Sequence, residues 1–315
     1  MTESKTKPKL IVICGPTGIG KTSAAIGVAE TFGGEIINAD SMQVYRSMNI
    51  GTAKPTAEEQ DRIAHHMVDV VDPGEDFDAA RFSLMARKIA REFIARGVTP
   101  IVAGGTGLYI KAMIYGLFQT EPPDPAIRRK LRAEAERIGS VALHRRLQEI
   151  DSEAAARIHT NDTFRIIRAL ETVGTTGRSI TDHHHQHGFR ESPFRVLKIG
   201  LDMDRERLYE RINERVDAMI AAGLLDEVRK LLDSGIDSEA KAMRALGYRH
   251  MVDYLKSRLP WEEAVRTMKR DTRRFAKRQL SWFRADEEII WSTPEEISDL
   301  YPTIEDFLNT VETHR

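Results

Sequence analysis

Short apolar runs alternate along this chain with longer stretches that have helical periodicity. The runs predict buried parallel strands, because a strand covered on both faces needs an almost unbroken apolar sequence. Helical patterns lie between them, for example over 22–32 and over 82–96, where Gly97 closes the pattern. This alternation predicts an α/β fold with a doubly wound parallel sheet. The predicted strands are 10–14, 35–38, 100–103, 194–201 and 289–291.

The clearest break in the pattern is the segment 119–125, which contains three prolines and cannot continue a helix. From there to about Ser192 the sequence is helical, with no good strand. We therefore expect a helical insertion domain over 121–189 within an α/β core formed by 1–120 and 190–315. The last third of the core, from Asp204 to Arg284, is again mostly helical.

A phosphate-binding loop directly follows the first predicted strand. The residues are Gly15, Pro16, Thr17, Gly18, Ile19, Gly20, Lys21 and Thr22. In this motif the glycines let backbone N–H groups point at phosphate oxygens, the lysine adds a positive charge, and the threonine hydroxyl can ligate Mg²⁺. An ordinary glycine-rich turn needs neither the strand before it nor the helix after it. The motif predicts a P-loop NTPase-like core and a phosphate or diphosphate site, but it does not identify the substrate.

Composition narrows the class of protein only a little. The chain has 315 residues, a net charge of −1 and a single cysteine, Cys14, so we expect neither a disulfide framework nor a thiol metal cluster. No apolar run approaches the length of a membrane span, and the first residues lack the apolar core of a signal peptide. We expect a cytoplasmic protein with no membrane association.

A carboxylate is predicted beside the phosphate loop. The second strand runs into Asn38–Arg46, which contains Asp40, and the carboxyl ends of parallel strands meet at one edge of a sheet. An aspartate in this position is often only a helix cap. Here its neighbours Ser41, Gln43 and Tyr45 offer hydrogen bonds and a stacking face that suit recognition of a base, and Asp40 is a candidate general base.

Two segments are strongly basic although the whole chain is nearly neutral. Residues 128–147 contain seven Lys or Arg against two Glu, and residues 261–284 contain eight against three acidic residues. A solvated helix face is the common explanation of such a run. Two dense patches, the second interleaved with Phe275, Trp282 and Phe283, favour contact with nucleic acid. We expect Trp282 itself to belong to the core.

Taken together and in order, these motifs resemble the tRNA dimethylallyltransferase family, also called tRNA isopentenyltransferases. The likeness covers nearly the whole chain and departs from the family pattern at Ala64, where proline is usual, and at Phe164, where glutamine is common. The segments that carry it are 15–22, 38–46, 49–55, 65–69, 71–73, 104–109, 161–162, 165–171, 211–216, 223–224, 244–249 and 277–284.

The resemblance implies transfer of a dimethylallyl group from dimethylallyl diphosphate to N6 of the adenosine on the 3′ side of the anticodon, in tRNAs that read codons beginning with U. It implies Mg²⁺ as cofactor, with Thr22 as its protein ligand. The expected catalytic residues are Asp40, Thr17, Arg215 and Thr106. The diphosphate is expected on residues 15–22 with Arg215, or as second choice Arg211. The residues expected to contact the tRNA anticodon stem-loop are Asp40, Ser41, Met42, Gln43, Thr106, Arg128, Phe164, Arg165, Ile166, Ile167, Arg168, Arg244, Gly247, Tyr248, Arg249, Lys277 and Arg278.

Other functions remain open at this stage. A phosphate-loop kinase is one, although the strand 100–103 runs into Gly104–Thr106 where a hydrolytic enzyme often has a magnesium-binding aspartate. An adenylate isopentenyltransferase acting on free nucleotide is a second, and an RNA-binding switch without prenyl chemistry is a third. We expect a monomer with no obligate protein partner.

Overall fold

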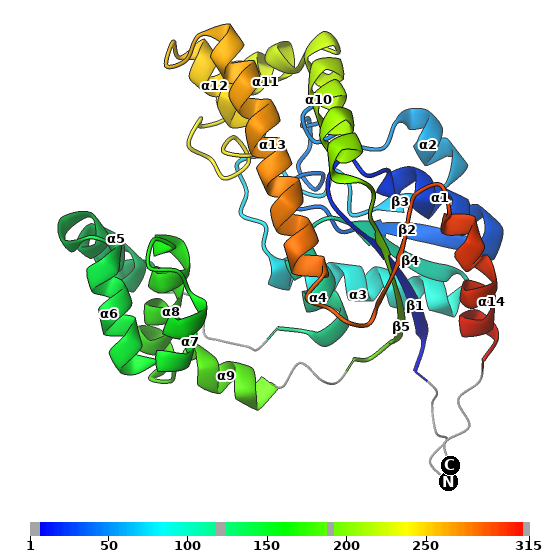
Figure 1. Cartoon of the computed structure of the whole chain (residues 1–315), viewed down its shortest axis with the longest axis horizontal. Coiled ribbons are helices and arrows are strands. Elements are labelled where there is room, and N and C mark those ends of the chain that lie inside the picture. The colour runs from blue at the N-terminus through cyan, green and yellow to red at the C-terminus, as the bar shows by residue number, and fades with distance from the viewer. Residues whose placement is uncertain (1–6, 118–123, 188–191, 311–315) are drawn as a thin grey trace. The chain divides into compact units, whose positions relative to one another are not determined.

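The computed structural model of the chain describes residues 7–117, 124–187 and 192–310, apart from the side chains of residues 184, 186 and 187 (Figure 1). Its backbone divides into two compact units. One unit comprises residues 1–114 with 193–315, and the other comprises residues 115–192. Most of the proline-rich break predicted at 119–125 lies outside the described residues.

The first unit contains a parallel sheet, as the sequence predicts. Within the described residues its strand order is β3-β2-β4-β1-β5-β6, and every pairing is parallel. The central strand β1 lies between β4 and β5, so that Ile13 is in register with both Ala103 and Ile199. The strands are β1 (Lys9–Cys14), β2 (Gly34–Asn38), β3 (His65–His66), β4 (Thr99–Gly104), β5 (Arg195–Leu201) and β6 (Ile289–Ser292).

Strand β3 is the one strand here that the sequence pattern does not predict. It contains only His65 and His66, pairs with Ile36 and Ile37 of β2, and forms the edge of the sheet. Two residues are too few to show any periodicity, so its formation depends on the neighbouring strand.

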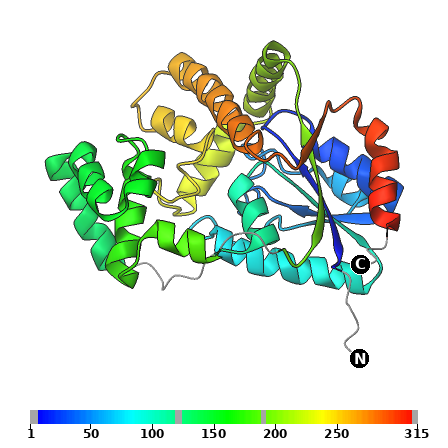
Figure 2. The same ribbon diagram turned by 60° about the horizontal axis from the view of Figure 1, so that its bottom comes forward.

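Helices cover both faces of this sheet (Figures 1 and 2). Ile11 and Ile13 pack with residues of α1 and α14 in one buried cluster, while Leu10 and Val12 alternate to the opposite face. The helices of this unit are α1 (Lys21–Phe32), α2 (Ala57–Arg62), α3 (Ala79–Ala95), α4 (Gly107–Tyr115), α10 (Arg205–Ala221), α11 (Leu224–Asp233), α12 (Tyr248–Leu255), α13 (Trp261–Phe283), the 3₁₀ helix η1 (Ile297–Leu300) and α14 (Tyr301–Asn309).

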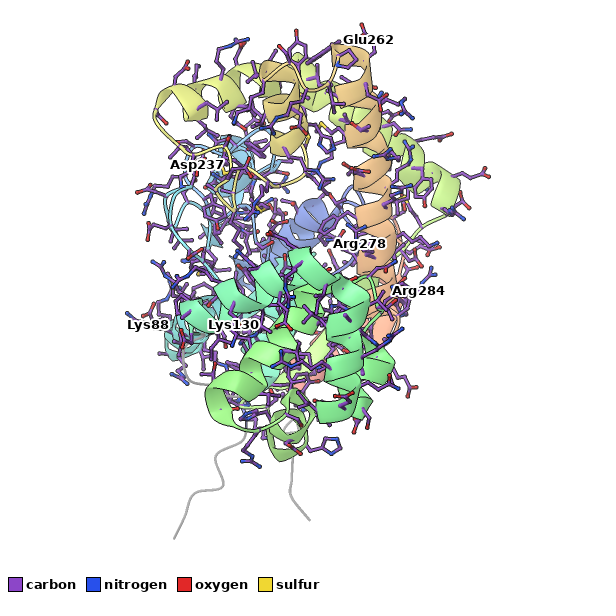
Figure 3. All side chains as sticks on the ribbon, turned by 90° about the vertical axis from the view of Figure 1, so that its left-hand side faces the viewer. Lys88, Lys130, Asp237, Glu262, Arg278 and Arg284 are labelled. Carbon is purple, nitrogen blue, oxygen red and sulfur yellow. The ribbon has the colours of Figure 1, made fainter. Side chains whose placement is uncertain are left out.

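Helices α10 to α13 form a group beyond the carboxyl ends of the strands (Figure 1). Lys269 and Arg273 of α13 bond to Asp217 and Asn213 of α10, so these two helices are joined by polar contacts as well as by packing. Figure 3 shows the length of α13, with Glu262 near its start and Arg278 and Arg284 near its end. This arrangement places the C-terminal helices at the edge of the sheet where the sequence predicts the ligand site.

The second unit is helical throughout its described residues. A small apolar core, which includes Leu131, Leu143, Leu147 and Leu170, joins its longer helices. Beside this core the buried carboxylate of Glu171 accepts two hydrogen bonds from the Arg128 guanidinium, each of 2.8 Å. The helices are α5 (Pro125–Ile138), α6 (Ser140–Ile150), α7 (Ser152–Arg157), α8 (Thr163–Thr176) and α9 (Ile180–His187).

Candidate active site

The phosphate loop lies between β1 and α1, as the motif predicts. Gly15 and Gly20 have φ angles of 150° and 104°, which other residues rarely adopt, and a Cβ on Gly15 would lie 2.8 Å from the Leu201 carbonyl oxygen. Lys21 begins the helix, and its Nζ donates a 2.7 Å hydrogen bond back to the Pro16 carbonyl. The lysine therefore folds over the loop, where its charge faces any bound phosphate.

Asp40 and Thr106 follow the neighbouring strands β2 and β4 and lie at the same edge. The Asp40 carboxylate accepts the Met42 N–H at 2.8 Å, and the Thr106 hydroxyl accepts the Ser41 N–H at 3.0 Å. The Thr106 N–H in turn donates to the Ala39 carbonyl at 3.1 Å. No helix begins at Asp40, so its side chain stabilises a turn instead of capping a helix, and these bonds also hold that turn against the turn after β4.

Two cavities meet at this edge, both within the first unit. The first, of about 550 Å³, lies beside the phosphate loop and is lined by residues that include Lys21, Thr22, Lys54 and Arg211. The second, of about 270 Å³, is lined by α10, α12 and α13 and by the turn after β2. Thr17, Asp40 and Arg215 line both cavities. These three residues are far apart in the sequence, and the fold brings them together where the two cavities meet. We call this place the junction.

Positive groups outnumber the single carboxylate of Asp40 at the junction, and this affects the pKa values of Lys21 and Arg215. Burial lowers the pKa of Lys21 to about 8, although Asp40 acts in the opposite direction and Arg215 adds to the decrease. Burial also lowers the pKa of Arg215, again opposed by Asp40, while Arg211 adds to the decrease. The first cavity is lined by the partly buried cations Lys21 and Arg215, with Lys54 and Arg211, against Asp40, Glu59 and Glu214. This excess of positive charge favours binding of an anion.

Arg211 and Arg215 lie one turn apart on α10, and their positions differ. Both line the first cavity, and the Arg211 guanidinium lies 3.5 Å from the place a Cβ on Gly20 would occupy. Arg215 alone of the two also lines the second cavity. This difference is consistent with Arg215 as the first choice for a residue that contacts reacting groups.

Most of the tRNA-binding residues predicted in the first unit line the second cavity. They are Asp40, Ser41, Met42, Thr106, Arg244, Tyr248, Arg249 and Arg278. Gln43 instead lines the first cavity, where its amide donates to the Thr52 and Ala53 carbonyls. Gly247 caps α12 with a φ of 85°, and Lys277 is exposed on α13.

The Arg249 guanidinium is held at the second cavity by Asp271. The two are 2.6 Å apart, and Asp271 also pairs with Arg270 at 2.9 Å. Burial alone would raise the pKa of Asp271, but hydrogen bonds from Arg270 and His250 and the nearby guanidinium charges keep it at about 2. The basic face of α13 is therefore partly neutralised by its own residues.

In the helical unit, four predicted residues border a cavity of about 220 Å³: Arg128, Phe164, Ile167 and Arg168. Phe164 is 74% exposed, and Arg165 pairs with Asp162. Ile166 is fully buried, so its side chain belongs to the core of this unit and not to a surface. Of its two neighbours on α8, Arg165 is exposed, whereas Ile167 is also buried and belongs to the same core.

The expectation that Trp282 belongs to the core is wrong, because the residue is 45% exposed. Its neighbour Phe283 is the buried one, and successive residues of a helix point in directions about 100° apart. The Trp282 indole packs over Gly107 at the start of α4, where a Cβ would overlap it.

Sequence reasoning missed Glu227, which holds residues 49–51 and Tyr248 in place at the wall of the second cavity. Its carboxylate accepts the N–H groups of Asn49, Ile50 and Gly51 at 2.9, 2.8 and 3.1 Å, and the Tyr248 hydroxyl at 2.6 Å. Burial, and then the Glu227 charge, raises the pKa of Tyr248 well above its usual range, so the phenol remains a donor. An acidic residue on an exposed-looking helix gives no sequence signal for this role.

We expect Glu227→Gln to lower the free energy of unfolding by about 1–3 kcal/mol, because the amide NH₂ group must face either the Asn49 and Ile50 N–H groups or the Gly51 N–H, which then lack an acceptor. Urea unfolding followed by circular dichroism measures this. Tyr248→Phe removes one hydrogen bond and leaves the carboxylate in place, so it should lose less. Equal stability of Glu227→Gln and the unchanged protein would rule out the support role.

The sheet, the loop and the facing arginines define an α/β phosphate-loop protein with a carboxylate, Asp40, beside the loop. A model of the IPP transferase family matches residues 43–286, and one of isopentenyl transferases matches residues 8–72. The chain therefore belongs to the tRNA dimethylallyltransferase (IPP transferase) family, and the resemblance seen in the sequence is confirmed.

Curated relatives and solved structures agree with this assignment. A tRNA dimethylallyltransferase of Desulfosudis oleivorans is 54% identical over 291 residues, which are 92% of this chain and 93% of that protein. The crystal structure of the tRNA isopentenylpyrophosphate transferase of Bacillus halodurans is 42% identical, has a TM-score of 0.72, and matches 96% of this chain and 97% of that one. A eukaryotic dimethylallyltransferase acting on tRNA is 27% identical, with a TM-score of 0.80 over 98% of this chain and 82% of that one.

No helix in the described part of the chain is long and apolar enough to cross a membrane.

Proposed function

We propose that this enzyme transfers the dimethylallyl group of dimethylallyl diphosphate to the exocyclic N6 of the adenosine next to the 3′ side of the anticodon, in tRNAs that read codons beginning with U. The observation that carries the proposal is the junction of two cavities at Thr17, Asp40 and Arg215. One cavity has the charge that suits a diphosphate, and the other has a mixed apolar and polar lining that suits a base.

The reaction forms one bond and breaks one. The N6 nitrogen bonds to C1 of the dimethylallyl group, the C1–O bond breaks, and diphosphate leaves with the bonding electrons. The nitrogen loses one proton in the process. Asp40 is the carboxylate at the junction, and we assign it as the acceptor of that proton, since an aromatic amine is a poor nucleophile without such a base.

The diphosphate is assigned to the first cavity. The backbone of residues 15–22, Lys21 and the guanidinium of Arg215, with Arg211 beside it, would neutralise the negative charge that develops on the leaving group. Fixed donors in a partly buried site are worth more than the same groups in water. Thr17, at the junction, lies where it would contact the bridging oxygen or the amine.

Mg²⁺ fits this donor set. Within the described residues no group of three or more His, Cys, Asp or Glu side chains forms a metal site by itself. Thr22 lines the first cavity, and Mg²⁺ typically takes one or two protein oxygens together with phosphate oxygens and water. When bound, the ion would supply positive charge to the departing diphosphate.

The adenine base is assigned to the second cavity. Phe275 and Met42 provide apolar surface, and Arg244 and Arg278 provide charge near a phosphate of the same strand. A base reaches such a pocket only after it leaves the anticodon stack. We assign the anticodon stem to the helical unit, through Arg128, Phe164, Arg165 and Arg168, and expect the enzyme to act in the cytoplasm as a monomer.

Incubation of the purified protein with Mg²⁺, labelled dimethylallyl diphosphate and an unmodified anticodon stem-loop tests the proposal, with AMP in a parallel tube. Label on the RNA alone is expected. Label on AMP alone would transfer the function to the free-nucleotide enzymes, and ATP consumption with candidate acceptors and no prenyl transfer would indicate a kinase. Stem-loops with and without an adenosine run then test which tRNAs are substrates.

A further inference from the structure

Gln279 is a buried polar residue of α13 that the reaction described above does not use. It is 7% exposed, and both atoms of its amide have partners. Its Oε1 accepts the N–H of Thr17 at 2.9 Å, and its Nε2 donates to the carbonyl of Gly105 at 2.8 Å. A buried amide with both groups satisfied is held in one orientation, because rotating it would break both bonds.

These two bonds join loops that are far apart in the sequence. Thr17 belongs to the phosphate loop, 262 residues from Gln279, and Gly105 belongs to the turn after β4, 174 residues from it. A Cβ on Gly105 would overlap the Gln279 amide nitrogen, so the turn needs glycine there for the contact to form. The next residue, Thr106, is bonded to the turn that carries Asp40.

The contact at Thr17 also changes what that residue can do. The N–H groups of a phosphate loop usually point at the ligand. The N–H of Thr17 points instead at Gln279, so its backbone is held from outside the loop, while the residue itself lines both cavities. The orientation of Thr17 at the junction is therefore set by a residue of α13.

Helix α13 also lines the second cavity, through Met268, Thr272, Phe275 and Arg278. We propose that Gln279 is a positioning residue: it fixes Thr17 and the turn after β4 against each other and against the helix that lines the base cavity. The proposal concerns the transfer reaction and so rests on the proposed function. A displacement of about 1 Å at a reacting centre can reduce the rate about 100-fold, and two buried hydrogen bonds are a means of preventing it.

Gln279→Met tests this, since it keeps the length of the side chain and removes both hydrogen bonds. The matched control is Thr267→Val on the same helix. Thr267 is also 7% exposed, but its hydroxyl donates only within α13, to the Glu263 and Ala264 carbonyls at 2.7 and 3.1 Å. The measurements are kcat and KM from steady-state kinetics, the melting temperature, and hydrogen exchange of the peptide that contains residues 15–20.

We expect Gln279→Met to lower kcat about 10- to 100-fold while KM for dimethylallyl diphosphate stays within about threefold. Exchange of the phosphate-loop peptide should become faster, because the Thr17 amide loses its acceptor. Thr267→Val should change neither. Gln279→Glu keeps an acceptor for Thr17 but turns a buried carboxylate oxygen toward the Gly105 carbonyl, so it should lower kcat at least as much as Gln279→Met.

Several results would overturn the proposal. They are a lower melting temperature with kcat unchanged, a rise in KM alone, or phosphate-loop exchange equal to that of Thr267→Val. The exchange experiment needs no substrate, so it tests the hydrogen bonds even if the unchanged protein prenylates no RNA. In that case the proposed function fails, and the exchange rates alone show whether Gln279 holds the phosphate loop.

Discussion

Asp40→Asn is expected to lower the rate of prenyl transfer by about 100- to 10,000-fold, the usual contribution of a general base. Asparagine keeps the Oδ1 that accepts the Met42 N–H, so the turn after β2 should survive the change. What it loses is the negative charge and the basic oxygen beside the amine. Single-turnover transfer of label to a stem-loop RNA measures the rate, and filter binding measures retention of RNA and of diphosphate.

The matched control is Asp78→Asn. Asp78 also accepts a backbone N–H through Oδ1, that of Arg81 at 2.8 Å, where it caps α3. It is exposed and lines neither cavity, so the same chemical change there should leave turnover intact. If Asp40→Asn retained turnover within about threefold of the unchanged protein, the role of Asp40 would be limited to holding the turn after β2.

Lys21→Met is expected to reduce transfer by about 100- to 1,000-fold, the usual loss when one donor to a developing negative charge is removed. Unlike the change at Asp40, it should also weaken binding of inorganic diphosphate, because the lysine faces the phosphate in the ground state as well. Isothermal titration with diphosphate measures the second effect. Unchanged diphosphate affinity in Lys21→Met would show that the loop holds its ligand without the lysine charge.

The pKa of Lys21 adds a pH dependence that separates it from other groups. Because burial lowers this pKa to about 8, the free enzyme loses the lysine charge as the pH rises above that value. Diphosphate affinity should then fall by up to about tenfold per pH unit. Lys21→Met should lack this part of the pH profile, so the difference between the two profiles is the diagnostic quantity.

The same shift has a defined effect on stability without ligand. The unfolded chain holds the Lys21 proton up to about pH 10.5, whereas the folded protein releases it from about pH 8. In this window the unfolded state binds more protons, so the contribution of Lys21 to the free energy of unfolding rises with pH. Comparison of the unchanged protein with Lys21→Met between pH 8 and 10.5 should show this rise in the former alone.

Much of the fold follows from local pattern. Apolar runs such as 10–14 and 100–103 predict buried strands between helices, and the parallel sheet confirms them. Strand β3 was not predicted, because two residues are too few to show an alternation of apolar and polar positions. Trp282 was misplaced because neighbouring residues near the end of a helix face different surroundings, and composition cannot tell which of Trp282 and Phe283 is covered.

The sequence by itself determined the phosphate loop and the family, because these reside in short motifs whose order and residue types are specific. Only the tertiary structure decided which side chains meet. Thr17, Asp40 and Arg215 share a junction, and Gln279 and Glu227 support it, through contacts that span most of the chain. Such contacts depend on how strands and helices pack, and a buried hydrogen bond between distant residues leaves no periodic trace in the sequence.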